Sequence, residues 1–118
     1  MIAIKRAYEK ASSSDGSRYL VDRLWPRGVS KDALKLTGWM RDVAPSDKLR
    51  RWYKHDPKKW TEFKRRYFAE LDANPDAWKP LARAARGRRI TLIFSSRETN
   101  LNNAVALQKY LQARLNLE

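Results

Sequence analysis

The 118-residue sequence contains no cysteine and only one histidine, His55. The absence of cysteine excludes disulfides, thiolate nucleophiles and Cys-ligated zinc, and a single histidine excludes a metal site built from several histidines. A Mg²⁺ site made of carboxylates alone stays open, although no motif in the sequence favours it. We therefore expect no metal and no cofactor.

Long hydrophobic runs are also absent. No stretch approaches the ~20 apolar residues that a membrane-spanning helix needs. The segment Met1–Arg6 lacks the apolar region and the cleavage pattern of a signal peptide. We expect a cytoplasmic protein with no membrane partner.

Acidic residues are scarce relative to basic ones. The chain carries 26 Lys and Arg against 13 Asp and Glu, for a formal net charge of +13. Such an excess attracts polyanions, so the expected partners are nucleic acid, a nucleotide or other phosphorylated ligand, or an acidic protein surface. The alternative is a basic enzyme that binds no nucleic acid. The oligomeric state is not indicated.

What the sequence does contain predicts a single α/β domain over residues 1–118. Its length supports one core, and five Trp, five Tyr and three Phe supply large apolar side chains for it. The order of apolar runs and turn signals predicts a three-layer-like domain with a short, partly parallel sheet of about three or four strands and about four helices. The predicted strands are Met1–Tyr8, Arg18–Leu24 and Arg89–Phe94, with Lys35–Val43 as an edge strand or an irregular crossing.

Residues with capping preferences mark the predicted helices. Ser30 precedes a short helical turn over Lys31–Leu34, and Ser46 and Asp56 are predicted N-caps of longer helices. Proline suits the first helical position and glycine the position after the last. On these grounds helices begin at Pro57 and at Pro75, the latter ending before Gly87, and a final helix follows the polar loop 95–103.

The two most apolar strands place two polar segments together. If Arg18–Leu24 and Arg89–Phe94 are parallel neighbours, their carboxyl ends lie side by side. Ligands of open α/β sheets bind outside these ends. The segment 22–28 and the loop 95–103 should then face each other.

Residues 22–28, Asp-Arg-Leu-Trp-Pro-Arg-Gly, concentrate polar and aromatic groups in one short segment. Arg23 and Arg27 carry planar donor groups that suit phosphate or carboxylate, and Trp25 offers a stacking face. Asp22 is the only candidate catalytic residue. Because alternate strand residues point to opposite faces, Asp22 and Arg23 should not serve the same side. The structural alternative is a buried Asp–Arg pair with Trp25 in the core.

The loop 95–103 offers a second set of candidate ligands. Hydroxyl groups, backbone N–H groups and the start of the following helix are suited to hold an anion there. The candidates are Ser95, Ser96, Arg97 and Asn102. The loop has no glycine, so it matches neither a P-loop nor a dinucleotide-binding fingerprint. The alternative is that Asn100 or Asn102 is an N-cap and the serines satisfy exposed backbone groups.

Residues 48–67 interleave Lys and Arg with aromatic side chains, a pattern found in surfaces that track nucleic-acid phosphates. The aromatic residues recur at core spacing, however, so most of them are expected inside, with the basic residues on a solvated helix face. His55 is interpreted as a turn residue with a structural hydrogen bond rather than as a general base.

Four parts of the sequence together resemble the YeaO-like family of bacterial domains of unknown function 488. They are Lys5-Arg6-Ala7-Tyr8, Val21–Gly28, Ala44-Pro45-Ser46 with Leu49-Arg50, and Asn102-Asn103-Ala104 with Leu107. The resemblance implies a small intracellular α/β domain and no particular activity. In that family Lys followed by Asp or Asn commonly stands where this chain has Arg97-Glu98, and His or Gln where it has Leu101. A catalytic role of this loop elsewhere in the family would therefore not carry over to this chain.

The leading hypothesis is an anion-binding module for nucleic acid or a nucleotide. The first alternative is a small-molecule enzyme that acts on a phosphorylated or nucleotide substrate through Asp22 and the nearby arginines. The second is a module that binds an acidic protein surface.

Overall fold

Four short parallel strands form the centre of the molecule. In this computed structural model, which describes residues 1–116, the sheet has the order β1-β4-β2-β3 and every neighbouring pair is parallel. The strands are β1 (Ile2–Arg6), β2 (Ser17–Leu20), β3 (Gly38–Trp39) and β4 (Ile90–Phe94). The predicted α/β domain with a short, partly parallel sheet is confirmed, and β2 and β4 are parallel neighbours as predicted.

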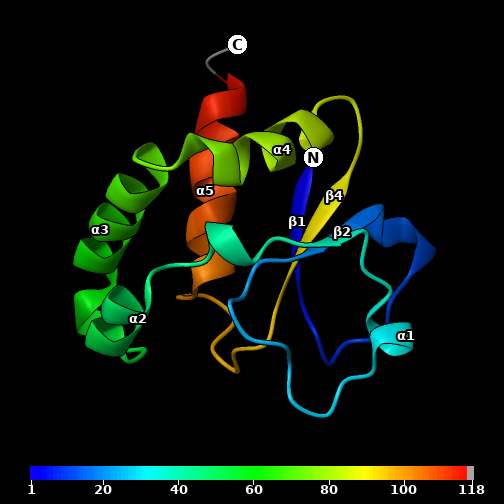
Figure 1. Ribbon diagram of the computed structural model, residues 1–118, viewed down its shortest axis with the longest axis horizontal. Helices are drawn as coiled ribbons and strands as arrows, with labels where there is room; N and C mark the ends of the chain where they lie inside the picture. The colour runs from blue at the N-terminus through cyan, green and yellow to red at the C-terminus, as the bar shows by residue number, and fades with distance from the viewer. Residues whose placement is uncertain (117–118) are drawn as a thin grey trace.

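The larger helices pack on one face of this sheet, and the short helix Lys31–Leu34 lies against the other (Figure 1). The α-helices are α1 (Lys31–Leu34), α2 (Asp47–Tyr53), α3 (Trp60–Asp72), α4 (Pro75–Ala85) and α5 (Asn103–Asn116), and short 3₁₀ turns cover Ser13–Asp15 (η1), Arg41–Val43 (η2) and Pro57–Lys59 (η3). None of the helices in residues 1–116 is both long and apolar enough to cross a membrane.

The side chains of β4 point alternately to the two faces of the sheet, and each face has its own apolar cluster. Ile90, Leu92 and Phe94 belong to the larger apolar cluster, which α2, α3, α4 and α5 complete. Ile93 belongs to a smaller cluster with Leu34 of α1, covered by the chain between β2 and β3. Because both faces are covered, all five residues of β4 are buried.

Ser30 and Ser46 cap the helices that they were predicted to cap, whereas Asp56 caps the 3₁₀ turn η3 and the predicted helix start at Pro57 is wrong, because α3 begins only at Trp60. The Ser30 hydroxyl accepts the N–H of Ala33, the Ser46 hydroxyl accepts that of Leu49, and the Asp56 carboxylate accepts that of Lys58. Gly87 follows the end of α4 with a φ of 78°, a left-handed conformation that favours glycine. These caps fix where the helices begin and end.

β2 is shorter than the sequence predicts, ending at Leu20 rather than Leu24. The Val21 N–H still reaches the Ile93 carbonyl, but the next donor on β4's side, the Ser95 N–H, is taken by the carboxylate of Asp22. A side chain has replaced the backbone acceptor that a continuing ladder would have used. The chain is therefore free to turn away at Asp22 and form the irregular segment that follows.

Candidate functional site

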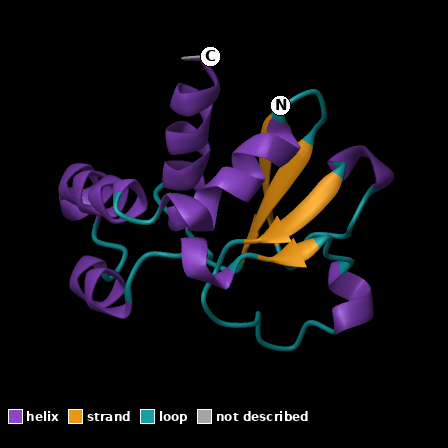
Figure 2. Ribbon diagram, turned by 45° about the horizontal axis from the view of Figure 1, so that its top comes forward, coloured by secondary structure: helices purple, strands orange, loops and turns teal. Residues whose placement is uncertain are grey.

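A cleft of about 370 Å³ lies at the carboxyl edge of the sheet, where the chain leaves β2 and β4. The loops that follow these two strands run side by side along this edge (Figure 2). α2 and the chain before it form the opposite wall. Residues lining the cleft include Tyr8, Asp22, Arg23, Trp25, Arg27, Arg50, Tyr53, His55, Ser95, Ser96 and Asn103. The predicted meeting of residues 22–28 with the loop 95–103 is confirmed.

Asp22 joins the ends of three elements. One carboxylate oxygen accepts the N–H and the hydroxyl of Ser95, at 2.9 and 2.8 Å, and the other accepts the Asn103 side-chain amide at 3.1 Å. Asn103 also donates to the Val21 carbonyl, which precedes Asp22. A carboxylate offers about four acceptor positions, so Asp22 is largely engaged by the protein itself. It holds the wall of the cleft together.

Arg23 lines the same cleft as Asp22, contrary to the expected alternation. The alternation does not apply because β2 has already ended at Leu20. The Arg23 Nη2 donates to the carbonyls of Ala44 and Pro45 at 3.3 and 3.5 Å, and its Nε lies 3.9 Å from the Asp47 carboxylate without a hydrogen-bond partner. The guanidinium is braced against the segment before α2 with donor capacity left over.

Arg27 is exposed on a turn completed by Gly28, whose φ of 77° is left-handed. Its carbonyl accepts the Tyr8 hydroxyl at 3.0 Å, and the Tyr8 ring lies under the Arg6 guanidinium at 5.0 Å. Within residues 1–116 the Arg27 guanidinium itself has neither a hydrogen bond nor an ion pair. The backbone position of Arg27 is thus fixed while its planar donor group stays available.

Trp25 combines the two roles that the sequence left open. Its indole N–H donates to the Val29 carbonyl at 2.7 Å, and its ring meets Trp39 edge to face at 5.4 Å. The side chain is half-buried and also lines the cleft. It forms an apolar wall of fixed orientation.

Only two of the four candidate residues in the loop 95–103 line the cleft. Ser95 and Ser96 line the cleft, whereas Arg97 is exposed outside its lining. Asn102 is buried and caps α5, accepting the Val105 N–H and donating to the Glu98 carbonyl, which is the capping alternative. The Ser96 hydroxyl accepts the Glu98 N–H, so its own hydrogen is free to donate.

The backbone of this loop is not an anion-binding nest. The Glu98 carboxylate accepts the N–H groups of Asn100 and Leu101, and these bonds, that of Asn100 first, lower the pKa of Glu98. Asp22 takes the Ser95 N–H in the same way. Because the protein's own carboxylates fill these donors, an anion in the cleft has to be held by side chains.

Sequence reasoning missed the contribution of α2. Arg50, which pairs with Asp47 at 3.0 Å, lines the cleft with Tyr53, whose hydroxyl donates to the Leu101 carbonyl at 2.8 Å. Burial, with Glu98 and Asp56 nearby, raises the pKa of the Tyr53 hydroxyl. The basic-aromatic pattern of residues 48–67 includes both residues but does not place them at this cleft, because α2 reaches the cleft through tertiary packing, with Tyr53 stacked on Phe63 at 4.3 Å.

His55 also lines the cleft, in a turn whose φ of 54° is left-handed. The turn position was predicted, but no hydrogen bond of its ring occurs among residues 1–116. Its ring centroid lies 5.8 Å from that of Tyr53. No cluster of three or more His, Cys, Asp or Glu side chains suited to a metal ion occurs in the same described range.

The chain is similar to a described protein family and to proteins that are named as uncharacterised. A family model described as the inactive DUF488-N3 subclade matches residues 1–118. The uncharacterised protein YeaO of Escherichia coli (strain K12) is 38% identical over 112 residues, which cover 95% of this chain and 97% of that protein. The uncharacterised protein Rv3073c of Mycobacterium tuberculosis (strain H37Rv) is 38% identical over 114 residues, covering 96% and 95%. No solved structure matches the chain.

Proposed function

Since the chain belongs to the DUF488 family of YeaO, in the subclade described as inactive, we propose that it is an anion-binding module whose ligand is nucleic acid or a nucleotide. The observation that carries the proposal is the free guanidinium of Arg27 at a cleft that Arg23 and Arg50 also line. Planar guanidinium groups bind phosphate oxygens in pairs, which makes arginine the preferred partner of phosphate.

The cleft suits one nucleotide in size and in the chemistry of its walls. Its volume of about 370 Å³ falls within the range of roughly 300–1,000 Å³ typical of small-molecule sites. Tyr8 and Trp25 supply aromatic surface for a base, since both rings line the cleft and both are held by hydrogen bonds. The Ser96 hydroxyl adds a donor beside the arginines.

A second candidate is an enzyme acting on a phosphorylated or nucleotide substrate through Asp22. The cavity beside Asp22 favours it, because a catalytic carboxylate needs an adjoining space for substrate. The three hydrogen bonds that Asp22 accepts from Ser95 and Asn103 weigh against it. Leu101, in the loop beside the cleft, supplies no acid or base either. We therefore favour binding without catalysis.

The test is a titration of the protein with nucleoside monophosphates, nucleosides and inorganic phosphate at low salt, with binding measured by isothermal calorimetry. We expect saturable binding of the nucleotide and weaker binding of its two parts. Arg27→Gln should weaken binding by about 10- to 100-fold, because a hydrogen bond to a charged group contributes roughly 1.5–3 kcal/mol. Arg97→Gln is the matched control, since Arg97 is exposed outside the cleft lining.

Equal affinities of the Arg27→Gln and Arg97→Gln proteins would contradict the proposal. Turnover of the nucleotide that is lost in Asp22→Asn would favour the enzyme instead. A pulldown that survives nuclease treatment would point to the remaining alternative, an acidic protein partner. We also propose a cytoplasmic location, where nucleotides and nucleic acids are abundant, which cell fractionation checks.

A further inference from the structure

Four exposed cations on and after α2 have no partner within residues 1–116. They are Lys48, Arg51, Lys54 and Lys58, here called the α2 row. None of their side chains makes a hydrogen bond, an ion pair or a ring contact in the described part of the chain. A cluster of cations without counter-charges repels itself and concentrates anions around it.

The neighbouring basic residues of α2 and α3 differ, because each is already engaged. Arg50 pairs with Asp47, and Arg65 and Arg66 pair with Glu62. Lys59 donates to the Trp52 carbonyl and lies 5.0 Å from the Trp52 ring, and Lys64 lies 5.5 Å from the Trp60 ring. Among the basic residues of α2, η3 and α3, the unpartnered charge is therefore confined to the α2 row.

The row follows the surface of one short helix. Lys48 and Arg51 are three residues apart in α2, so their side chains are neighbours on its surface. Lys54, three residues further, is the C-cap of α2 with a φ of 49°, and Lys58 lies in η3. α2 has seven residues and is thus about 10 Å long at 1.5 Å per residue.

The α2 row is continuous with the cleft. Arg50, which lines the cleft, lies four residues before Lys54 and accepts the Lys54 N–H at its carbonyl, so the two side chains are neighbours at the end of α2. A chain of phosphates lying along the row therefore passes beside a residue of the cleft wall.

The aromatic side chains beside the row are not available for reading bases. The Trp52 ring is covered by the Arg66 guanidinium at 4.1 Å, and Tyr53, Phe63 and Tyr67 are buried. A partner on this face is therefore recognised by its regularly spaced charge alone, independently of base sequence.

From these observations, and resting on the proposed function of the cleft, we propose that the α2 row docks the phosphate backbone of a single-stranded nucleic acid whose terminal nucleotide occupies the cleft. A single strand is required because a cleft of about 370 Å³ accepts an unstacked nucleotide and not a paired duplex end. The ligand class is thereby an oligonucleotide rather than a free nucleotide.

The test compares a fluorescent 12-nucleotide poly-dT strand with thymidine monophosphate, using anisotropy and calorimetry over a series of salt concentrations. The row variant is Lys48→Gln, Arg51→Gln, Lys54→Gln and Lys58→Gln combined. The control variant, Lys79→Gln, Arg83→Gln, Arg88→Gln and Lys109→Gln combined, removes the same charge from exposed positions outside the row and the cleft. Circular dichroism confirms that both variants are folded.

We expect the strand to bind wild type at least 10-fold more tightly than the monophosphate. The row variant should lose that gain and flatten the slope of log affinity against log salt by about 2 to 3, since each phosphate contact in a single strand contributes ~0.7. The control variant should keep most of the gain in affinity and most of the salt slope. Monophosphate binding should be unchanged in the row variant.

Some results would overturn the docking surface alone, and a different result would overturn nucleotide binding in the cleft. A strand that binds no better than the monophosphate, or equal losses in the row and control variants, would leave the cleft as a nucleotide site and remove the docking surface. If polyglutamate of the same length and charge displaces the strand as well as unlabelled poly-dT does, the row binds any acidic polymer, and docking of a nucleic acid is contradicted. Strand binding with no detectable binding of the monophosphate, unaffected by Arg27→Gln, would contradict the proposed function instead.

Discussion

Asp22 is the residue on which the shape of the cleft depends. Its carboxylate accepts hydrogen bonds from Ser95 and Asn103, which lie more than 70 positions later in the sequence. Its carbonyl accepts the Trp39 indole N–H at 2.8 Å. The residue therefore joins the ends of β2, β3 and β4 to the start of α5.

The first prediction concerns Asp22→Asn. An amide in place of the carboxylate turns one of its two acceptors into a donor, which then faces the donors of Ser95 or Asn103. We expect a loss of about 1–3 kcal/mol in the free energy of unfolding, the cost of leaving a partly buried polar group without a partner. Urea denaturation followed by tryptophan fluorescence measures it. Asp32→Asn, at an exposed position of α1, is the control, and equal losses in the two variants would refute the role of Asp22.

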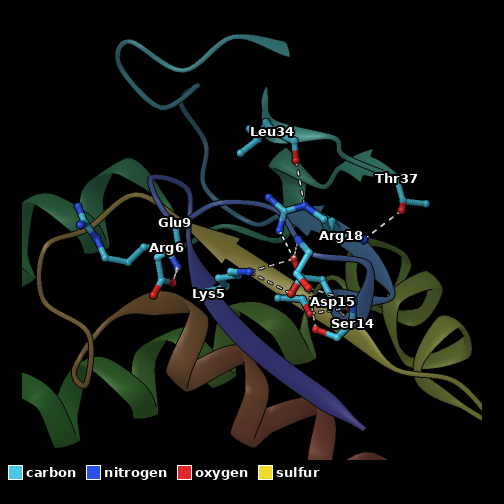
Figure 3. A network of polar contacts seen from close by, with 10 residues as sticks. Lys5, Arg6, Glu9, Ser14, Asp15, Arg18, Leu34 and Thr37 are labelled. Atoms are coloured by element: carbon cyan, nitrogen blue, oxygen red, sulfur yellow. Dashed lines mark hydrogen bonds and ion pairs between the residues drawn. The ribbon is translucent and has the colours of Figure 1, made fainter. Parts of the chain in front are cut away.

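Asp15 forms a second network, on the other side of the sheet from the large helices (Figure 3). Its carboxylate accepts the Ser12 N–H, the Lys5 ammonium at 3.1 Å and the Arg18 guanidinium at 2.6 Å. Arg18 is only 4% exposed and donates its Nε to the Leu34 carbonyl. Breaking such a buried pair by removing one partner costs roughly 3–5 kcal/mol.

The second prediction is a loss of stability in acid that depends on Asp15. Burial opposes ionisation, but the hydrogen bonds from Ser12, Lys5 and Arg18 outweigh it and hold the pKa of the Asp15 carboxyl below its usual value. A carboxyl whose pKa is lower in the folded state stabilises the fold above its unfolded pKa, and this stabilisation is lost as the pH falls through the folded value. Urea midpoints measured from pH 6 to pH 2.5 should fall more steeply in wild type than in Asp15→Asn.

Parallel curves for wild type and Asp15→Asn would show that Asp15 does not cause the loss of stability in acid.

Glu62 is the control, a carboxylate at the surface whose pKa is also lowered. The hydrogen bond from Arg65, with that from Arg66, lowers the pKa of Glu62 to about 2. Because its side chain is 38% exposed and screened by solvent, Glu62→Gln should change the acid sensitivity little.

At the scale of elements, α2 determines whether the second wall of the cleft is in place. Its N-cap Ser46 is held by the Glu70 carboxylate of α3, which accepts both the Ser46 N–H at 2.9 Å and its hydroxyl at 2.6 Å. Tyr53 at the other end packs on Phe63, also of α3. α3 therefore positions α2, and α2 carries Arg50 to the cleft.

The third prediction compares two N-cap serines. Ser46→Ala removes the acceptor of the Leu49 N–H and leaves Glu70 with one donor fewer, so we expect a loss of about 1–2 kcal/mol in unfolding free energy. Nucleotide affinity should fall as well, because the start of α2 loosens. Ser30→Ala removes the matched cap of α1, far from this wall, and should leave affinity unchanged. A similar loss of affinity in both variants would mean that α2 does not position the site.

Local signals predicted the ends of elements, while tertiary contacts decided where the elements lie. The side chains of Ser30, Ser46 and Asp56 accept backbone N–H groups two or three residues away, and Gly87 acts through its own left-handed conformation, so these roles could be inferred from the sequence. The early end of β2 could not, because it depends on Asp22 bonding to Ser95, 73 residues later. The edge strand β3 lies within the segment 35–43, for which a short helix, an edge strand and an irregular crossing were the alternatives.

At the scale of the whole molecule, whose net charge is +13, some basic side chains are paired with carboxylates and others are not. The carboxylates of Asp22 and Glu98, which line or border the cleft region, are engaged by the loop 95–103. Within residues 1–116, the guanidinium of Arg27 and the α2 row carry positive charge that no carboxylate pairs with. The site could be predicted in part, because the strand ends bring Arg23, Arg27 and the serines together, but Arg50 and Tyr53 arrive only through helix packing.

The fourth prediction is that phosphate stabilises the fold more than chloride does at equal ionic strength. Any excess cationic charge is screened equally by the two salts, whereas an anion bound only by the folded state adds stability that grows with its concentration. The melting temperature in phosphate should exceed that in chloride, and Arg27→Gln should reduce the difference. A difference of the same size in Arg27→Gln would reflect general exclusion of phosphate from the protein surface.

The most direct test of the central claim, that the cleft binds a nucleotide, is a titration of ¹⁵N-labelled protein with a nucleoside monophosphate followed by two-dimensional NMR. The account predicts saturable shifts of the Trp25 indole and of the Gly28 and Ser96 amides, with α4 unaffected. No shift at these three positions at millimolar nucleotide and low salt, or shifts spread evenly over the basic surface, would contradict it.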